Sequence, residues 1–100
     1  MSDVRALAAA YGVTIECVDL GDWGAATLVA EYDPRGSAIR VNARVFDRPN
    51  AGVANGALEH AIAHELYHHR EAIGEIARLP ERRARERAAD AFAEACAGAR

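Results

Sequence analysis

Hydrophobic residues near the start of the chain recur at helical spacing. Val4, Ala8 and Tyr11 would lie on one face of a helix, because side chains at positions i, i+4 and i+7 share a face. Gly12 follows them, and glycine is common just after the last turn of a helix. The pattern predicts a short amphipathic helix over about residues 3–11.

The next segments have the period of β-structure. Residues 13–19 alternate between apolar and polar side chains until a glycine-containing stretch interrupts them. Residues 26–32 and 37–46 then flank the tetrapeptide Asp33-Pro34-Arg35-Gly36. Because proline presets φ and glycine tolerates a positive φ, this tetrapeptide predicts the turn of a hairpin.

Two longer helices are expected in the second half of the chain. After a loop at residues 48–52, Asn55 is placed to cap a helix over residues 57–73. We expect this helix to continue, frayed or kinked, through residues 74–79. A last helix is predicted over residues 80–97, since proline suits the first position of a helix.

The order helix, strand, hairpin, helix, helix predicts an α+β fold. One hundred residues fit a single domain over residues 1–100 and leave little room for a second core. We expect a small antiparallel three-stranded sheet packed on the N-terminal helix, the helix over residues 57–73 and the C-terminal helix. Alanine supplies much of the apolar content and buries little area, so a bound metal would add stability to this domain.

The helix over residues 57–73 carries His64-Glu65-Leu66-Tyr67-His68, which has the pattern H-E-x-x-H. Its histidines fall about 40° apart on one helical face, so both imidazoles can bind one ion. Glu65 is displaced from the pair and can reach water on the metal without occupying a coordination site. The apolar residues of the opposite face, which we expect to pack on the sheet, are Leu58, Ile62, Leu66 and Ile73.

A zinc site for catalysis requires a third protein ligand. Glu86 and Asp90 are spaced i, i+4 and share a face of the last helix, beside alanines that allow close approach. We expect Glu86 to bind the ion and Asp90 to accept a hydrogen bond from a ligand imidazole, which fixes its tautomer. The alternative is a solvated surface on which these acids pair with the arginines of residues 82–87.

These motifs resemble a known family. H-E-x-x-H followed by Glu86-Arg87-Ala88-Ala89-Asp90-Ala91-Phe92-Ala93 is similar to the gluzincin metallopeptidases. The segment Ala38-Ile39-Arg40-Val41-Asn42 resembles the sheet-edge strand of the ImmA/IrrE-type members, and the small size resembles the minigluzincins. The order of elements over residues 4–93 is similar as well.

The resemblance implies that His64, His68 and Glu86 bind Zn²⁺ and that Glu65 is the general base. It further implies that an extended peptide or protein substrate pairs with one strand edge, whose residues are Ile39, Arg40, Val41 and Asn42. The expected activity is that of a zinc-dependent endopeptidase. Zinc lowers the pKa of its water to roughly 7 and polarises the carbonyl, while Glu65 takes the water proton and delivers it to the leaving amine.

The developing oxyanion needs a donor besides the metal, and the candidates are His60, Tyr67, His69 and Tyr32. His69 lies at the edge of the apolar stripe, which also fits a buried histidine with a satisfied ring. Trp23 and Phe92 are interpreted as packing residues of the core or of loops rather than as substrate platforms.

Two other functions remain open at this stage. The chain could be a non-catalytic zinc-binding domain that binds a partner through an exposed strand edge. Such a structural site would be closed by a fourth ligand such as His60 or Cys96. The motif could also be accidental in a metal-free domain, although only about 0.01 chance matches are expected in this composition.

Charge and hydropathy exclude other classes of partner. A net charge of −3 argues against a protein that binds nucleic acid by neutralising phosphates. No stretch is apolar for the length of a membrane span, and no export signal is recognisable, so we expect a cytoplasmic protein without a membrane partner. Cys17 and Cys96 are expected to remain free thiols.

Overall fold

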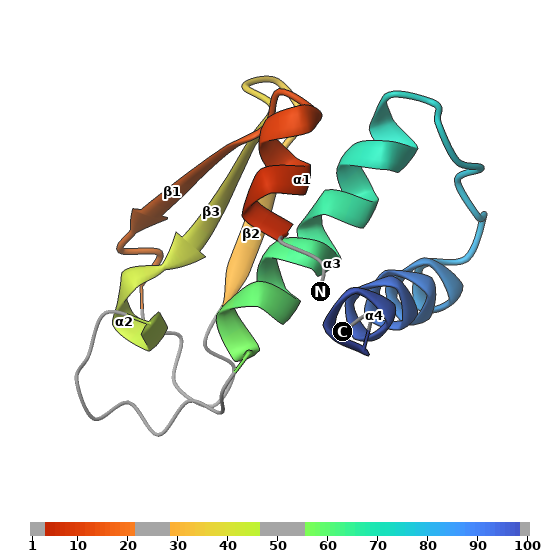
Figure 1. Cartoon of the computed structure of the whole chain (residues 1–100). Helices are drawn as coiled ribbons and strands as arrows, with labels where there is room; N and C mark the ends of the chain where they lie inside the picture. The colour runs from red at the N-terminus through yellow and green to blue at the C-terminus, as the bar shows by residue number, and fades with distance from the viewer. Residues whose placement is uncertain (1–3, 22–28, 47–55, 99–100) are drawn as a thin grey trace.

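The elements of the structure follow one another in the predicted order, with one short helix added. The computed structural model describes residues 4–21, 29–46 and 56–98. The helices and strands of these residues are α1 (Val4–Ala10), β1 (Thr14–Val18), β2 (Ala30–Asp33), β3 (Ala38–Asn42), α2 (Ala43–Phe46), α3 (Ala57–Ala72) and α4 (Arg82–Gly98) (Figure 1). The predicted α+β class is confirmed.

A glycine ends α3 earlier than the sequence pattern suggested. Gly74 adopts a positive φ of 78°, and its N–H donates to the carbonyl of Glu71 at 3.1 Å. This backbone closure is typical of a helix C-terminus, because glycine enters the left-handed region without a Cβ clash. The predicted helical extension through residues 74–79 is therefore wrong, and α4 begins at Arg82 instead of Pro80.

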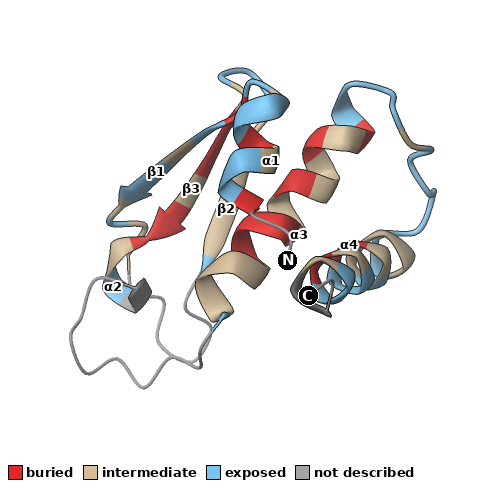
Figure 2. Ribbon diagram, in the orientation of Figure 1, coloured by how far each residue is buried: buried red, intermediate tan, exposed pale blue. Residues whose placement is uncertain are grey.

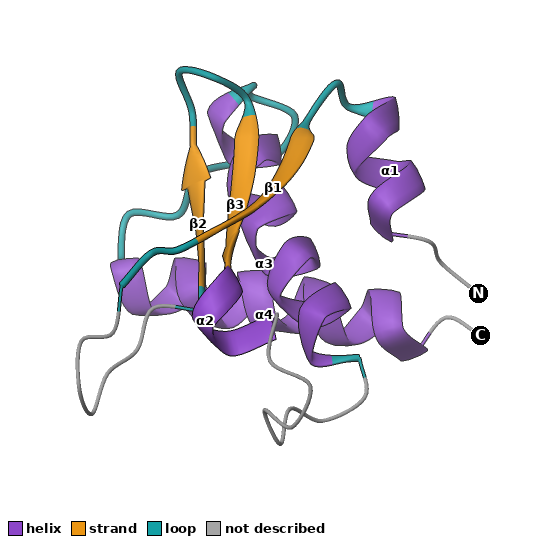
Figure 3. Ribbon diagram, turned by 90° about the vertical axis from the view of Figure 1, so that its left-hand side faces the viewer, coloured by secondary structure: helices purple, strands orange, loops and turns teal. Residues whose placement is uncertain are grey.

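The sheet is mixed, and the prediction of a fully antiparallel sheet is wrong. Its strand order is β1-β3-β2 (Figure 3). The predicted hairpin of β2 and β3 is confirmed, and the carboxylate of Asp33 accepts hydrogen bonds from the N–H groups of Arg35 and Gly36 in its turn. β1 instead pairs in parallel with β3, so that Ile15 lies opposite Ile39.

A buried asparagine supports this topology. Asn42 is fully buried at the end of β3. Its side chain accepts a hydrogen bond from the N–H of Leu20 at 3.1 Å and donates one to the carbonyl of Gly21 at 3.0 Å. These bonds hold the chain that leaves β1 against the end of β3. The alternating pattern of β1 indicates which face is buried but not which strand is its neighbour.

The hydrophobic core lies between the sheet and the helices α1 and α3, on one side of the sheet as predicted (Figure 2). Ile39 and Val41 of β3 meet Ile62 and Leu66 of α3 there, and each is at most 3% exposed. Ile73 was expected on the same stripe but is 54% exposed, because it follows the last turn of α3. The other stripe residues confirm the predicted orientation of the helix.

Helix α4 packs against α3 on the side away from the sheet, so the prediction that the C-terminal helix packs on the sheet is wrong (Figure 1). Ala89 and Ala93 of α4 are fully buried, and their small side chains let the two helices approach closely. Cys17 and Cys96 are free thiols, as predicted. Across the part of the chain that the structure describes, no helix combines the length and the apolar character that a membrane span requires.

Some expectations fall outside the described residues. These are the helix cap at Asn55, the loop at residues 48–52 and the packing of Trp23. Of the predicted strand over residues 26–32, the described part forms the first positions of β2. The predicted strand over residues 37–46 divides into β3 and α2.

Candidate metal centre

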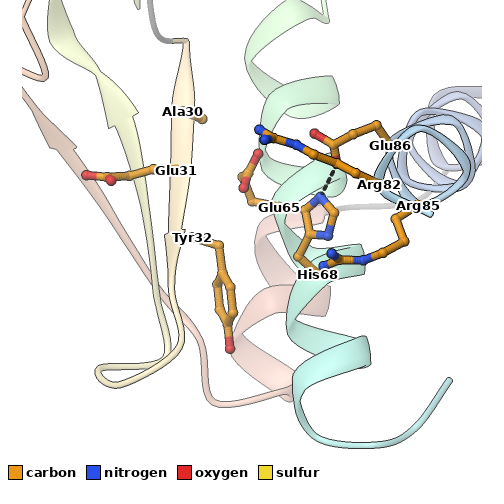
Figure 4. Close-up of a pocket in the computed structure, with 8 residues that line it drawn as sticks. All are labelled: Ala30, Glu31, Tyr32, Glu65, His68, Arg82, Arg85 and Glu86. Atoms are coloured by element: carbon orange, nitrogen blue, oxygen red, sulfur yellow. Dashed lines mark ion pairs between the residues drawn. The ribbon is translucent and has the colours of Figure 1, made fainter. Parts of the chain in front are cut away.

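Two histidines of α3 and one glutamate of α4 converge in space. His64 and His68 occupy successive turns of α3, with ring centroids 5.1 Å apart. The Oε2 atom of Glu86 lies 2.8 Å from Nε2 of His68 (Figure 4). The same atom lies 3.6 Å from Nε2 of His64. One ligand atom of each residue falls within 4.8 Å of the other two. The structure thus brings together the three side chains that the sequence analysis selected.

Each imidazole also contacts a carboxylate through its other nitrogen. Nδ1 of His64 lies 2.7 Å from Oδ1 of Asp90, and Nδ1 of His68 lies 2.8 Å from Oε1 of Glu71. A carboxylate accepts a hydrogen bond from a protonated Nδ1, which leaves the lone pair of a neutral ring on Nε2. Both Nε2 atoms face Glu86, so the rings are oriented for a shared ion.

Asp90 lies where the sequence analysis expected it, beside the imidazole of His64. Burial works to raise the pKa of its carboxyl, but hydrogen bonds from His64 and His60 outweigh burial and lower it. The carboxylate is therefore charged at neutral pH. It can hold the His64 ring in one orientation and raise the basicity of Nε2.

Glu71 was not identified from the sequence. Its side chain is only 2% exposed, and it accepts two hydrogen bonds of 3.2 Å from the guanidinium of Arg85. Burial would raise the pKa of Glu71, but the bonds from Arg85 and His68 prevail and lower it. The i, i+3 spacing from His68 was the available signal. Arg85 was interpreted as part of a solvated arginine face, whereas it joins α4 to α3 through this buried carboxylate.

Glu65 is largely buried and lies beside the Nε2 atom of His64. Its side chain is 15% exposed, and its Oε2 is 3.9 Å from Nε2 of His64. Burial raises the pKa of Glu65 to about 7, with further contributions from the charges of Glu86 and Glu31, although His64 opposes the shift. A carboxyl that titrates near neutral pH is well matched to accepting and returning a proton.

An open groove runs between β2 and the two helices. A cavity of about 500 Å³ lies beside His68 and is bordered by Tyr32 (Figure 4). Another of about 500 Å³ lies beside His64 and is bordered by Ala57 and Ala61. A smaller cavity of about 160 Å³ continues past Tyr32 to Pro34. Glu65 borders both large cavities, so the converging side chains lie near the middle of the groove.

The strand beside this groove is β2, and the expectation for β3 is wrong. β3 is hydrogen-bonded to β1 on one side and β2 on the other, so it has no free edge for a substrate. The residues concerned are Ile39, Arg40, Val41 and Asn42. Ile39 and Val41 lie in the core. Arg40 forms a 2.8 Å ion pair with Asp33, and Asn42 is hydrogen-bonded to the chain that follows β1. Ala30 and Tyr32 of β2 border the cavities instead.

Two of the proposed oxyanion donors bond to each other. His69 is 3% exposed, and its Nδ1 lies 2.8 Å from the hydroxyl of Tyr32. The interpretation of His69 as a buried, satisfied histidine is confirmed. Burial and the charge of Asp33 raise the pKa of Tyr32, so its hydroxyl stays protonated at neutral pH.

The remaining candidates lie at the margins of the site. His60 borders the cavity beside His64, with its Nε2 3.5 Å from the carboxylate of Asp90. Tyr67 packs against Phe92, with ring centroids 6.1 Å apart, so Phe92 is a packing residue as predicted. The cavity-lining position of His60 leaves it the best placed of these side chains toward a bound substrate.

The donor set fits a catalytic zinc ion. Zinc takes imidazole nitrogen and carboxylate oxygen, and its catalytic sites use three protein ligands and leave a position open. The group found among the described residues contains neither His60 nor Cys96, the two side chains proposed to close a structural site. His60 contacts Asp90, and Cys96 packs against the hydrophobic core. The three converging side chains match the number of protein ligands in an open site.

Replacing Glu86 by alanine is expected to lower zinc affinity about a hundredfold. Mutating a residue that supports a metal ligand typically lowers metal affinity roughly 10–100-fold. Removing a direct ligand should lower the affinity by at least the upper end of this range. Competition with a chromophoric chelator measures the affinity. Glu94→Ala, an exposed position on the same helix, is the control and should bind zinc as the wild type does. Unchanged affinity in Glu86→Ala would remove Glu86 from the ligand set.

The geometry shows the convergence of His64, His68 and Glu86 and the carboxylate behind each imidazole. No protein-family model matches the chain, and no curated protein or solved structure matches it either.

Proposed function

We propose that this protein is a zinc-dependent endopeptidase. The observation that carries the proposal is the convergence of His64, His68 and Glu86. The partly buried Glu65 lies beside them, and an open groove extends on both sides. A purely structural site would not need Glu65 at that position. It would also be closed by a fourth protein ligand.

The chemistry follows from the placement of Glu65. Zinc held by the three ligands would acidify a water molecule and polarise a carbonyl group. Glu65 is the base that accepts the proton of the attacking water, and the same carboxyl then donates it to the leaving amine. Its partly buried position favours this exchange, because burial brings the pKa of the carboxyl close to neutral pH.

The carboxylates behind the histidines have a positioning role in this proposal. Asp90 holds the ring of His64, and Glu71 holds the ring of His68. Because Arg85 of α4 anchors Glu71, the same contact fixes the spacing between the helix that bears the histidines and the helix that bears Glu86. The three proposed ligand side chains are thus held in position in the metal-free protein.

The substrate in this proposal is an extended segment of peptide or protein. It lies along β2, whose outer edge pairs with no other strand among the described residues. Main-chain hydrogen bonds to a strand edge give affinity that does not depend on side chains, and the flanking cavities then select side chains. The scissile bond would lie over Glu65, between the two larger cavities.

Removal and return of zinc test the function. The zinc-loaded protein is expected to cleave members of a mixed peptide library, as read by mass spectrometry. A chelator should stop cleavage, and one equivalent of zinc should restore it. Stoichiometric zinc binding without cleavage of any library member would favour the non-catalytic zinc domain. Absence of zinc binding would refute both.

A further inference from the structure

The carboxylates around the Tyr32 side of the groove are already committed to partners. Glu71 is bonded to Arg85 and His68. Glu31 extends to the opposite side of β2 from His68, where it lies 3.7 Å from Arg40 (Figure 4). Glu65 and Glu86 belong to the metal centre. None of these groups is left to neutralise a further cation in this part of the groove.

Two arginines border the same part of the groove and form no ion pair with any described residue. Arg82 lines the cavity beside His68, and its side chain extends from α4 toward the groove (Figure 4). Arg78 lines the smaller cavity that continues past Tyr32. Arg82 is also the first residue of the long helix α4, where the helix dipole disfavours a positive charge. A negative group bound there would relieve this repulsion.

The opposite part of the groove has a different chemistry. Beside His64, the cavity is floored by the small apolar residues Ala57 and Ala61 of α3 and by Val29 and Ala30 from the strand side. None of the described residues that line this cavity is an arginine. Among the described residues, the His68 side of the groove therefore presents two arginines without an ion pair, whereas small apolar residues form the floor on the His64 side.

We propose that the groove selects peptides with an acidic side chain on the His68 side, held by Arg82 with the support of Arg78. This inference rests on the proposed function and names its substrate class. A small or apolar side chain occupies the cavity over Ala57 and Ala61. The bound carboxylate belongs to an internal Asp or Glu instead of a chain terminus, because the groove continues past Tyr32 to Pro34.

Binding to a non-cleaving variant tests the selectivity apart from catalysis. Zinc-loaded Glu65→Gln protein is titrated with fluorescent peptides that differ only by Glu or Gln at one position, scanned along an apolar sequence with an amidated C-terminus. We expect the Glu peptide to bind about tenfold more tightly at one position, as hydrogen bonds to a charged group provide. A second set of Gln peptides carries a free C-terminal carboxylate and tests whether a chain terminus binds in place of an acidic side chain.

Arginine variants identify the cation. Arg82→Met in the Glu65→Gln background is expected to bind the Glu and Gln peptides equally, with unchanged zinc content. Arg83→Met removes an exposed arginine one position along α4 that borders none of the three cavities, and should keep the tenfold preference. Mapping the cleavage sites of the wild type should place Asp or Glu on one fixed side of the scissile bond.

Several results would overturn the inference. Equal binding of the Glu and Gln peptides at every position would show that the groove ignores charge. A preference that survives in Arg78→Met/Arg82→Met would assign it to another group. A preference seen only with the free C-terminus would replace the acidic side chain by a terminal carboxylate. If the wild type cleaves no peptide, hydrolysis fails as a function, yet the binding preference still decides the selectivity.

Discussion

Glu65→Gln is expected to abolish peptide cleavage while the protein still binds one zinc ion. Glutamine keeps the size and the neutral hydrogen-bonding capacity of the protonated glutamate, but it cannot accept the proton of the attacking water. General acid–base catalysis contributes roughly 10²–10⁴-fold, so we expect kcat to fall by about 10³-fold or more. Cleavage of a fluorogenic peptide, normalised to the zinc content of each preparation, measures the effect.

The control for this result is a glutamate remote from the groove. Glu94→Gln changes an exposed carboxyl on α4 and should retain wild-type kcat. The Glu65→Gln protein should also melt cooperatively and still bind one zinc ion, which separates lost chemistry from lost structure. Cleavage within a few fold of the wild type would show that Glu65 is not the base and that the carboxyl has another role.

Local sequence spacing predicted where two of the proposed ligands lie, because one helix imposes their geometry. Residues at i and i+4 of a helix share a face wherever the helix lies, so His64 and His68 had to lie together. Glu86 required one further step, the close packing of two helices at small residues. Ala89 and Ala93 provide that packing, and both are fully buried.

The strand beside the groove could not be predicted in the same way. Strand order depends on contacts between distant residues, here the bonds from Asn42 to the chain at Leu20 and Gly21. The pattern of β3 is compatible with an edge strand or a central strand, and only the pairing of β1 decides between them. The expectation that β3 forms the edge of the sheet failed for this reason.

The roles of the acidic and basic residues depend on which pairs the fold forms. Glu71 and Arg85 resemble ordinary surface residues in the sequence, and their bidentate contact across two helices exists only in the folded chain. The same pairing changes the interpretation of the 82–87 arginines. Arg85 is committed to Glu71, which distinguishes it from Arg82 at the groove.

In the metal-free protein, Glu65→Gln is expected to increase stability, and the increase should grow with pH. Folding raises the pKa of Glu65 from 4.5 to about 7, mainly through burial. Between these values the folded state binds more protons than the unfolded state, so the free energy of unfolding of the wild type falls as pH rises. The shift corresponds to about 3 kcal/mol above pH 7, and to less than about 1 kcal/mol near pH 5.

Urea unfolding of both proteins between pH 5 and pH 8, with a chelator present, measures this difference. Glutamine does not titrate, so all other groups cancel to first order when the two curves are subtracted. A difference in unfolding free energy that stays constant with pH would show that Glu65 ionises as readily in the folded as in the unfolded chain. That outcome would remove burial as the source of its basicity.

Zinc should reverse the effect, and this links stability to function. A bound cation favours the charged form of Glu65, so the stability difference between wild type and Glu65→Gln should shrink when both proteins are saturated with zinc. The charge of Glu65 would then destabilise the metal-free protein but not the zinc-bound protein. Such a result would show that bound zinc offsets the cost of burying this charge. Retaining a glutamate at this position, where glutamine would fold more stably, is what a catalytic base requires.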